Sequence, residues 1–498
     1  MTDGADSDRP SLKLRVARTI KWNIIDKLLS QLLYAVTGIV LARELSEYEF
    51  GLVGAILVFQ SFATLFVDSG FSYALLQRKE PTQADYSTIL WFNIGVSVAI
   101  YAVLYILSPW IASLYNGDPR LITLARVMFL SFIINATSIV QTNILMKRMD
   151  VKMVTVSNSC GLFAGSVVGI WMAVTGWGAW ALVWQTIVLG GVKSAILWLC
   201  NSWRPSAVFS WHILRSFMRV GSGVAASAFL NVLFQNIYGF FIGRRSGMNA
   251  LGYYTQADKW SKMGISSLSA VLTSSFLPVL SRYQDEPVEF AAVTAKTNRF
   301  TSYLLLPAMG MLAVMATPIF HALFGVKWDN SIVLFQLLLL RGVFTVYQSL
   351  YNNYIIALGK AGRMVWTEVL RDVAALVAIV ITLPEIDITR PGDVMWGIKI
   401  FVGGQIAASA VTWLVTLIVA ARISRRGWLR YIVDAIPYMA ITAVAMIVMA
   451  WLSTAVENPW LLCGAQLGAG AGVYIGINAL LRSRIQRDVF AYLRHRRL

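Results

Sequence analysis

The stretch FVDSGFSYALLQRK, residues 66–79, ends a long apolar run that begins near Gly51. It places Asp68 within apolar sequence and closes on two cations, Arg78 and Lys79. A charged side chain at the centre of a bilayer costs about 2.5–3.5 kcal/mol on insertion scales. The stretch therefore predicts a membrane helix whose carboxylate has a role, either in ion coupling or between helices. Because Gly70 follows, we expect the helix to end nearby and favour a structural role, with Asp68 facing the interior.

The composition of the whole chain fits an integral membrane protein. Of the 498 residues, 57% are hydrophobic and 13% are charged, whereas soluble domains carry about 25% charged residues. No polar stretch is long enough to form a soluble domain. The polar, basic N-terminus does not match a cleavable signal peptide. The three cysteines and three histidines are scattered, so neither a disulfide framework nor a metal site is predicted.

The apolar windows predict fourteen membrane helices. A helix needs about 20 apolar residues to cross the hydrocarbon layer. The windows of that length are 21–42, 50–71, 86–107, 121–143, 154–174, 177–200, 221–243, 259–280, 301–324, 331–358, 365–383, 394–420, 431–452 and 459–480.

The basic residues give the predicted orientation. Most of the 42 lysines and arginines fall in the loops and tails that this count places on one side of the membrane. Such loops are cytoplasmic by the positive-inside rule, so both termini are predicted to be cytoplasmic. This bias accounts for most of the net charge of +17 and leaves no basis for a nucleic-acid partner.

Short matches indicate an internal repeat. Arg43 and Gly51 in LARELSEYEFGLVG align with Arg244 and Gly252 in IGRRSGMNALGYYT, both 201 residues apart. Further on, SPWIASLY from Ser108 matches TPIFHALF from Thr317. The repeat unit spans six helices, an even number, so both copies enter the membrane from the same side, as the halves of some transporters do.

The predicted fold is therefore an all-α polytopic membrane protein with two six-helix bundles related by a pseudo-two-fold axis and two further C-terminal helices. The predicted segments are a basic cytoplasmic tail (1–20), the first bundle (21–200), a cytoplasmic linker (201–220), the second bundle (221–420), the extra helix pair (421–480) and a basic amphipathic tail (481–498). The last segment, LRSRIQRDVFAYLRHRRL, has the composition of a helix lying on anionic lipid.

Three motifs, LSEYEFGLVG, VDSGFSYALLQRK and LGYYTQADKW, resemble those of the polysaccharide flippases of the MOP superfamily. The resemblance is to the Wzx-like branch of exporters for colanic acid and related exopolysaccharides, and it covers the first twelve helices. It implies a MATE-like fold with a central cavity, and transfer of undecaprenyl-diphosphate-linked oligosaccharides from the inner to the outer leaflet of the bacterial inner membrane. It implies no cofactor, and leaves open coupling to a proton or sodium gradient and contact with polymerase or export machinery.

The charges within the predicted spans are the candidate site residues. A diphosphate needs hydrogen-bonding partners when it leaves water, and arginine binds phosphate in a bidentate manner. Charges within spans usually face a bundle interior or a cavity. The substrate-binding candidates are Arg341, placed first, then Lys27, Arg371 and Lys399, with Asn231 and Gln235, which lie four residues apart and share a helix face. The candidates for ion coupling or interhelical pairing are Asp68, Asp26, Glu368 and Asp372.

Other interpretations of these residues and of the chain remain open. Each span charge could instead pair with another helix, and adjacent residues such as Arg371 and Asp372 are not expected to bridge, since helix neighbours point about 100° apart. The alternative functions are a multidrug or other small-molecule exporter of the same superfamily, and a membrane polysaccharide polymerase or ligase. The basic span residues disfavour the first, and short external loops without a catalytic constellation disfavour any enzyme. The sugar repeat, the coupling ion and the oligomeric state stay undetermined.

Overall fold

The computed structural model describes residues 12–68, 71–360, 362–387 and 394–495, and within these ranges the chain is helical without strands. Part of the predicted N-terminal tail (1–11) and the last three residues of the C-terminal tail lie outside the described residues. The chain divides into two compact units, Met1–Gly252 and Tyr253–Leu498. The predicted segment boundaries within the chain stay a prediction.

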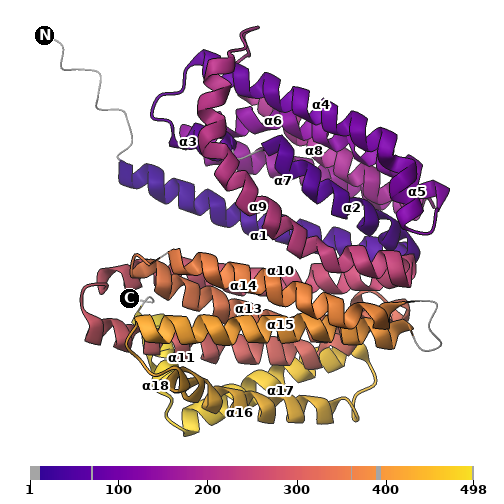
Figure 1. The fold of residues 1–498 in the computed structure, drawn as a ribbon. Coiled ribbons are helices and arrows are strands. Elements are labelled where there is room, and N and C mark those ends of the chain that lie inside the picture. Colours follow the sequence, from indigo (N-terminus) through magenta and orange to yellow (C-terminus); the bar gives the residue numbers. More distant parts are fainter. Residues whose placement is uncertain (1–11, 69–70, 361, 388–393, 496–498) are drawn as a thin grey trace, which may run out of the picture. The chain divides into compact units, whose positions relative to one another are not determined.

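The first unit contains nine helices within the described residues and the start of a tenth (Figure 1). They are α1 (Leu12–Glu44), α2 (Glu47–Asp68), α3 (Phe71–Gln77), α4 (Gln83–Leu114), α5 (Pro119–Met128), α6 (Leu130–Lys147), α7 (Val151–Val174), α8 (Trp180–Cys200), α9 (Trp211–Ser246) and the first residues of α10 (Met248–Arg282).

The second unit continues α10 and adds the remaining helices (Figure 1). They are α11 (Pro287–Val314), α12 (Ala316–Leu323), the 3-10 turn η1 (Val326–Trp328), α13 (Asp329–Ala357), α14 (Gly362–Thr382), the 3-10 turn η2 (Leu383–Ile386), α15 (Val394–Ile423), α16 (Trp428–Leu452), α17 (Pro459–Leu480) and α18 (Arg484–His495).

Helices cover all fourteen predicted spans, which confirms the polytopic all-α fold. Nine helices in the described ranges are long and apolar enough to cross a membrane alone, and the bent pair α11 and α12 makes ten. The spans predicted at 50–71, 221–243, 259–280 and 365–383 form helices α2, α9, α10 and α14, which are not among these ten. In α14 the span carries three charges close together, Glu368, Arg371 and Asp372.

The two prolines that the repeat aligns act differently. Pro318 has no N–H for the carbonyl of Val314, the last residue of α11, and the chain bends there by 58° between α11 and α12. Pro109 lies inside α4, which continues to Leu114. It frees the Tyr105 carbonyl, which instead accepts hydrogen bonds from the Ser108 hydroxyl (2.8 Å) and Arg126 Nε (3.4 Å). These substitutes explain how the α4 helix continues through a proline.

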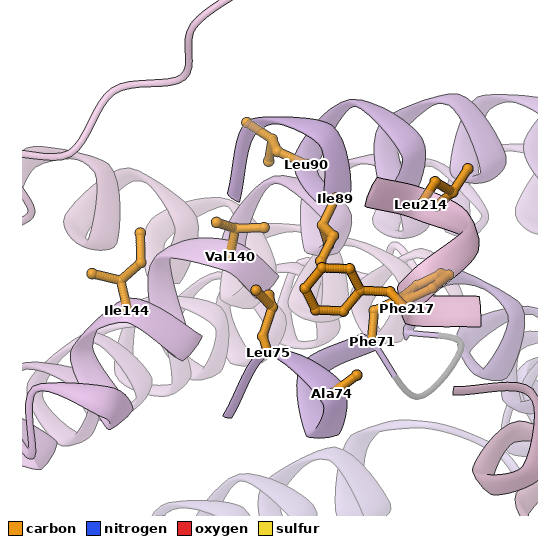
Figure 2. Close-up of a cluster of buried hydrophobic side chains, with 9 residues drawn as sticks. All are labelled: Phe71, Ala74, Leu75, Ile89, Leu90, Val140, Ile144, Leu214 and Phe217. Carbon is orange, nitrogen blue, oxygen red and sulfur yellow. The ribbon is translucent and has the colours of Figure 1, made fainter. Parts of the chain in front are cut away.

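The stretch at residues 66–79 forms the end of α2 and the short helix α3. Figure 2 shows side chains of α3, α4, α6 and α9 converging on one buried apolar cluster. Its members are Phe71, Ala74, Leu75, Ile89, Leu90, Val140, Ile144, Leu214 and Phe217. The short helix α3 thus buries Phe71 and Leu75. Residues 69 and 70 lie outside the described residues, so the expected end of the helix near Gly70 stays a prediction.

Charges at the edge of this cluster are paired. Arg78, which follows α3, lies 3.0 Å from the fully buried carboxylate of Asp85, and its guanidinium stacks over the Phe217 ring at 5.1 Å. Asp85 also accepts a hydrogen bond from the Thr82 backbone N–H (2.7 Å), completing a capping box at the start of α4. Arg78 of the 66–79 motif therefore helps to fix the entry into α4.

Glycines allow α7 and α8 to approach closely. Gly161, Gly165 and Gly169 recur every four residues along one face of α7. A Cβ atom would lie 2.6 Å from the Leu189 carbonyl oxygen at Gly161 and 2.7 Å from that of Gln185 at Gly165. This small-residue pattern is a common means of packing membrane helices.

The two glycines aligned by the repeat take part in one reciprocal contact. A Cβ atom on Gly51 of α2 would collide with the carbonyl oxygen of Met248, at the start of α10. A Cβ atom on Gly252 would collide with the carbonyl oxygen of Glu47, at the start of α2. Met248 follows Glu47 by the same 201 residues that separate the glycines. The two repeat copies therefore supply equivalent halves of this helix crossing.

Buried polar groups join α16 to α11 and α13 in the second unit. Asn298 of α11 donates to the Tyr431 carbonyl (2.9 Å) and accepts from the Tyr351 hydroxyl (3.1 Å). Asp434 of α16 lies 3.1 Å from Arg299 of α11. Because hydrogen bonds in an apolar interior must be made within the protein, this network makes α16, the first helix of the extra C-terminal pair, an integral part of the unit.

We predict that substitution of either glycine in the reciprocal contact destabilises the protein. Gly51→Ala and Gly252→Ala each force two backbones apart, and overpacking of this kind costs about 1–3 kcal/mol. Gly95→Ala is the matched control, because no atom lies within 4 Å of the added methyl group. Thermal unfolding of the purified variants should give lower midpoints for the first two than for the control. Equal midpoints for all three would contradict the packing argument.

Candidate functional site

The first-ranked sequence candidate, Arg341, lies in a cluster of charges between α10 and α13. Its guanidinium Nη2 is 3.8 Å from Oδ1 of Asp258, and both side chains are about five-sixths buried. The second oxygen of Asp258 accepts from Nζ of Lys262 at 2.6 Å, one helical turn further along α10. One carboxylate therefore serves two cations, which leaves the group with a net positive charge.

The cluster retains unused hydrogen-bonding capacity. Nε of Arg341 is buried without a hydrogen-bond partner in the part of the chain that is described. Lys259, next to Asp258, adds a further cation whose Nζ lies 5.5 Å from the centre of the Trp260 ring. A guanidinium with free donors beside an ammonium group can bind a phosphate oxyanion with charge-assisted hydrogen bonds. We call Arg341, Asp258 and Lys262 the α10–α13 charge cluster.

A second group of charges, on α14, consists of one arginine and two carboxylates and has a net negative charge. Arg371 forms ion pairs with Glu368 and with Asp372, the latter at 2.9 Å. Asn352 of α13 donates to Glu368 at 3.4 Å. The expectation that adjacent residues would not bridge is wrong for Arg371 and Asp372, because the long arginine side chain reaches back to its neighbour. These two carboxylates engage the Arg371 guanidinium, which is thus less available to a substrate than Arg341.

A third group lies in the first unit, between α1, α7 and α8. Asp26 of α1 has a hydrogen bond with the side chain of Asn158 of α7 and an electrostatic interaction with Lys193 of α8. Its Oδ1 atom is buried and has no hydrogen-bond partner among the described residues. The arrangement is an interhelical charge pair with one carboxylate oxygen available for a further ligand.

The remaining candidates have simpler surroundings. Gln235 donates to Asn231 at 3.0 Å, which confirms that the two share a face of α9, and both are exposed. Lys27 is exposed on α1 and Lys399 is half-buried on α15. The side chain of Asp68 lies outside the described residues, and Asp68 is the last residue of α2 before residues 69 and 70, which are not described either.

Sequence reasoning missed two partners. Asp258 and Asn158 were not among the candidates. Asp258 contacts the candidate Arg341, and Asn158 is hydrogen-bonded to the candidate Asp26. The four-residue spacing of Asp258 and Lys262 was a usable signal for the first. No local signal identifies Asn158, because its partner Asp26 comes from a distant helix.

An apolar cavity lies beside α13 in the second unit. It has a volume of about 500 Å³ and is lined from α11, α13, α15 and α16. Its walls include Leu306, Leu340, Phe344, Trp413 and Met439, and Leu340 directly precedes Arg341. The cavity can hold an apolar chain, and its wall residue Leu340 is the sequence neighbour of Arg341 in the charge cluster. Among the described residues, no group of histidine, cysteine or acidic side chains could hold a metal ion.

Solved structures share this fold. The structure titled "Lipid II flippase MurJ, inward closed conformation" matches with a TM-score of 0.76 at 13% identity, over 95% of this chain and all of that one. A multidrug resistance MATE family transporter of the MOP superfamily, in an inward-facing conformation, matches with a TM-score of 0.60 at 18% identity, over 79% of this chain and 96% of that one. These similarities confirm the predicted MATE-like fold.

Sequence comparison agrees with the resemblance. The succinoglycan biosynthesis transport protein ExoT of Rhizobium meliloti (strain 1021) is 24% identical over 73% of this chain and 74% of its own length. The lipopolysaccharide biosynthesis protein WzxC of Escherichia coli (strain K12) is 24% identical over 67% of this chain and 68% of its own. The family model described as "Polysaccharide biosynthesis protein" matches residues 40–333. The chain therefore belongs to the polysaccharide biosynthesis protein family, with the fold of the MOP superfamily.

Proposed function

We propose that this protein is a flippase for undecaprenyl-diphosphate-linked oligosaccharides. It moves repeat units from the inner to the outer leaflet of the bacterial inner membrane by alternating access, for exopolysaccharide, lipopolysaccharide or capsule synthesis. Family membership supports transport in polysaccharide biosynthesis. The observation that carries the proposal is the α10–α13 charge cluster, in which Arg341 and Lys262 share the single carboxylate of Asp258.

This cluster suits a diphosphate that enters and leaves. Moving a phosphate out of water is unfavourable unless hydrogen bonds replace its hydration. Arg341 and Lys262 supply donors, while Asp258 holds them in place when no substrate is bound. The contact of 3.8 Å between Arg341 and Asp258 is too long for a hydrogen bond, so an incoming phosphate does not have to break one there.

The apolar cavity supports a lipid-linked substrate. Its lining by Leu340 and Val343 of α13 places apolar surface on either side of Arg341 in the sequence. A polyprenyl chain is apolar and flexible, and its burial in such a cavity is favourable in proportion to the area removed from water. A phosphate-binding group and an apolar cavity, both carried by α13, thus correspond to the two chemical parts of the proposed substrate.

The surroundings of the protein follow from the same proposal. The positive-inside distribution supports an inner-membrane location with both termini in the cytoplasm. The direct partners are the lipid-linked oligosaccharide and membrane lipids. Polymerase or export machinery would act on the product in the outer leaflet.

We predict that Arg341→Ala traps complete lipid-linked repeat units on the cytoplasmic leaflet. The lost charge-assisted hydrogen bonds are worth about 1.5–3 kcal/mol, so transport should fall roughly 10- to 100-fold. The measurement uses a deletion strain complemented with each variant, in which leaflet location and surface polysaccharide are quantified. Arg341→Lys keeps the charge and should recover part of the activity, whereas unchanged surface polysaccharide in Arg341→Ala would refute the assigned role.

The same strain separates the proposed function from its alternatives. Lipid-linked repeat units that accumulate on the cytoplasmic leaflet in the deletion strain support a flippase. Single units accumulating on the outer leaflet would show that transport is intact and that the protein is a polymerase or ligase. No change in either pool would contradict a flippase role in that strain and favour a different exported substrate.

We further propose that Asp26 couples transport to a proton or sodium gradient. Its buried, unpartnered Oδ1 atom can accept a proton or ligate a sodium ion, and either event would weaken the attraction to Lys193. This gives the α1–α8 pair two states that an ion gradient could bias.

We predict that Asp26→Asn abolishes the stimulation of transport by an imposed gradient in inverted membrane vesicles. Asp372→Asn is the matched control and should keep the stimulation, because Asp372 is engaged by Arg371. Stimulation that persists in Asp26→Asn would exclude this residue from coupling.

A further inference from the structure

The C-terminal helix α18 is a docked part of the second unit. Ile485 is 4% exposed, and Asp488 forms an ion pair with Lys296 of α11 at 2.7 Å. Gln486 donates from Nε2 to the carbonyl of Ile475 of α17 at 3.1 Å. The helix is therefore held on two sides, by α11 and by α17, and the surfaces around it have a defined shape.

Two hollows flank α18. The α11-side hollow has a volume of about 520 Å³, and its charged lining consists of Lys296, Arg299, Arg484, Arg487 and Asp488. The α17-side hollow has a volume of about 660 Å³, and its polar lining consists of Asn478, Arg482, Ser483, Gln486 and Arg487. Arg487 and Ala491 line both, so the two hollows adjoin at these residues.

Positive charge exceeds negative charge in the α11-side hollow. Lys296 is paired with Asp488 and Arg299 with Asp434. In the part of the chain that the structure describes, neither Arg484 nor Arg487 forms an ion pair, and both are exposed. Two guanidinium groups thus stand beside a hollow without a carboxylate of their own.

The α17-side hollow contains polar atoms that lack partners. Gln486 is 4% exposed, yet its Oε1 atom accepts no hydrogen bond within the described residues. The same holds for the buried hydroxyl of Ser483. A buried polar atom of this kind is costly unless a ligand or water satisfies it, and an acceptor such as Oε1 requires a donor, which a hydroxyl group provides.

Phe490 lines the α17-side hollow, and two exposed leucines at the end of α17 lie in sequence between Ala479 and Arg482, which also line it. Leu480, the last residue of α17, and Leu481 are 84% and 66% exposed, and Phe490 on α18 is 50% exposed. A free phosphate ion would make no use of these side chains. A phospholipid would cover them with acyl chain while its headgroup reaches the arginines.

We propose that the hollows on either side of α18 form a site for one anionic phospholipid with a hydroxyl-bearing headgroup. Arg484 and Arg487 hold the phosphate, and the headgroup hydroxyls donate to Gln486 and Ser483. The exposed leucines and Phe490 contact the acyl chains. The inference rests on the membrane location in the proposed function but is independent of the transported substrate, which is assigned to a different cluster.

Phosphatidylglycerol is the test lipid, and native mass spectrometry of the purified full-length protein in detergent measures its binding. The wild type should bind it more tightly than phosphatidylethanolamine with the same acyl chains. Arg484→Gln/Arg487→Gln should weaken phosphatidylglycerol binding about 10- to 30-fold and leave phosphatidylethanolamine unchanged. If the double variant does not fold, Arg487→Gln alone should weaken binding about fivefold, because each basic residue contributes separately.

Arg422→Gln/Arg430→Gln is the control, since both arginines are exposed and line neither hollow. It removes the same charge and should bind phosphatidylglycerol as the wild type does. If the control lost as much affinity for phosphatidylglycerol as the double variant, binding would depend on general surface charge and the proposal would be overturned.

Competition identifies the source of the phosphate. Inorganic phosphate or undecaprenyl diphosphate that displaced phosphatidylglycerol at equal concentration would overturn the assignment to a phospholipid. Failure to displace it supports the assignment. Because this assay needs no transport, its failure is distinguishable from failure of the flippase proposal.

Discussion

The hydrocarbon core of a membrane offers no partner to a polar or charged group, so each such group must be satisfied within the protein. The structure meets this constraint in most places with complete local pairs. Asp85 binds Arg78, and the freed carbonyl above Pro109 accepts from Ser108 and Arg126. Two carboxylates are each shared by two cations, Asp434 by Arg299 and Arg426 and Asp258 by Arg341 and Lys262. The α10–α13 charge cluster differs in position, because Arg341 lies near the middle of α13, whereas Asp434 lies in the second turn of α16. An imbalance of this kind within a membrane protein is most simply explained by an anionic ligand.

Close approach of helix backbones is the second determinant of the fold. Gly161 and Gly165 on α7, and the two glycines at the α2–α10 crossing, stand where any larger side chain would meet a backbone carbonyl. Without a hydrophobic driving force between membrane helices, such packing supplies much of their association. The reciprocal contact of Gly51 and Gly252 also gives the sequence repeat a physical meaning, since each copy contributes the small residue that the other requires.

Hydropathy and charge bias were sufficient to predict the helices, because span length and composition are local properties. The side-chain partners could not be predicted. Asp258 and Asn158 were missed because the choice of partner depends on which helices meet. Arg371 and Asp372 were expected not to bridge, yet the flexible arginine reaches its neighbour. Pro109 and Pro318 occupy matching motifs, but the bend between α11 and α12 lies at Pro318, whereas the carbonyl freed by Pro109 accepts from the neighbouring Ser108 and from Arg126 of α5.

The central claim is that Arg341 and Lys262, sharing Asp258, bind a diphosphate. The most direct measurement is the affinity of the purified protein for undecaprenyl diphosphate without sugar, determined by native mass spectrometry. The account predicts that Arg341→Ala weakens binding roughly 10- to 100-fold, whereas Asp258→Asn, which removes the competing carboxylate, preserves or strengthens it. Equal affinity of Arg341→Ala and the wild type, or a loss in Asp258→Asn as large as in Arg341→Ala, would contradict it.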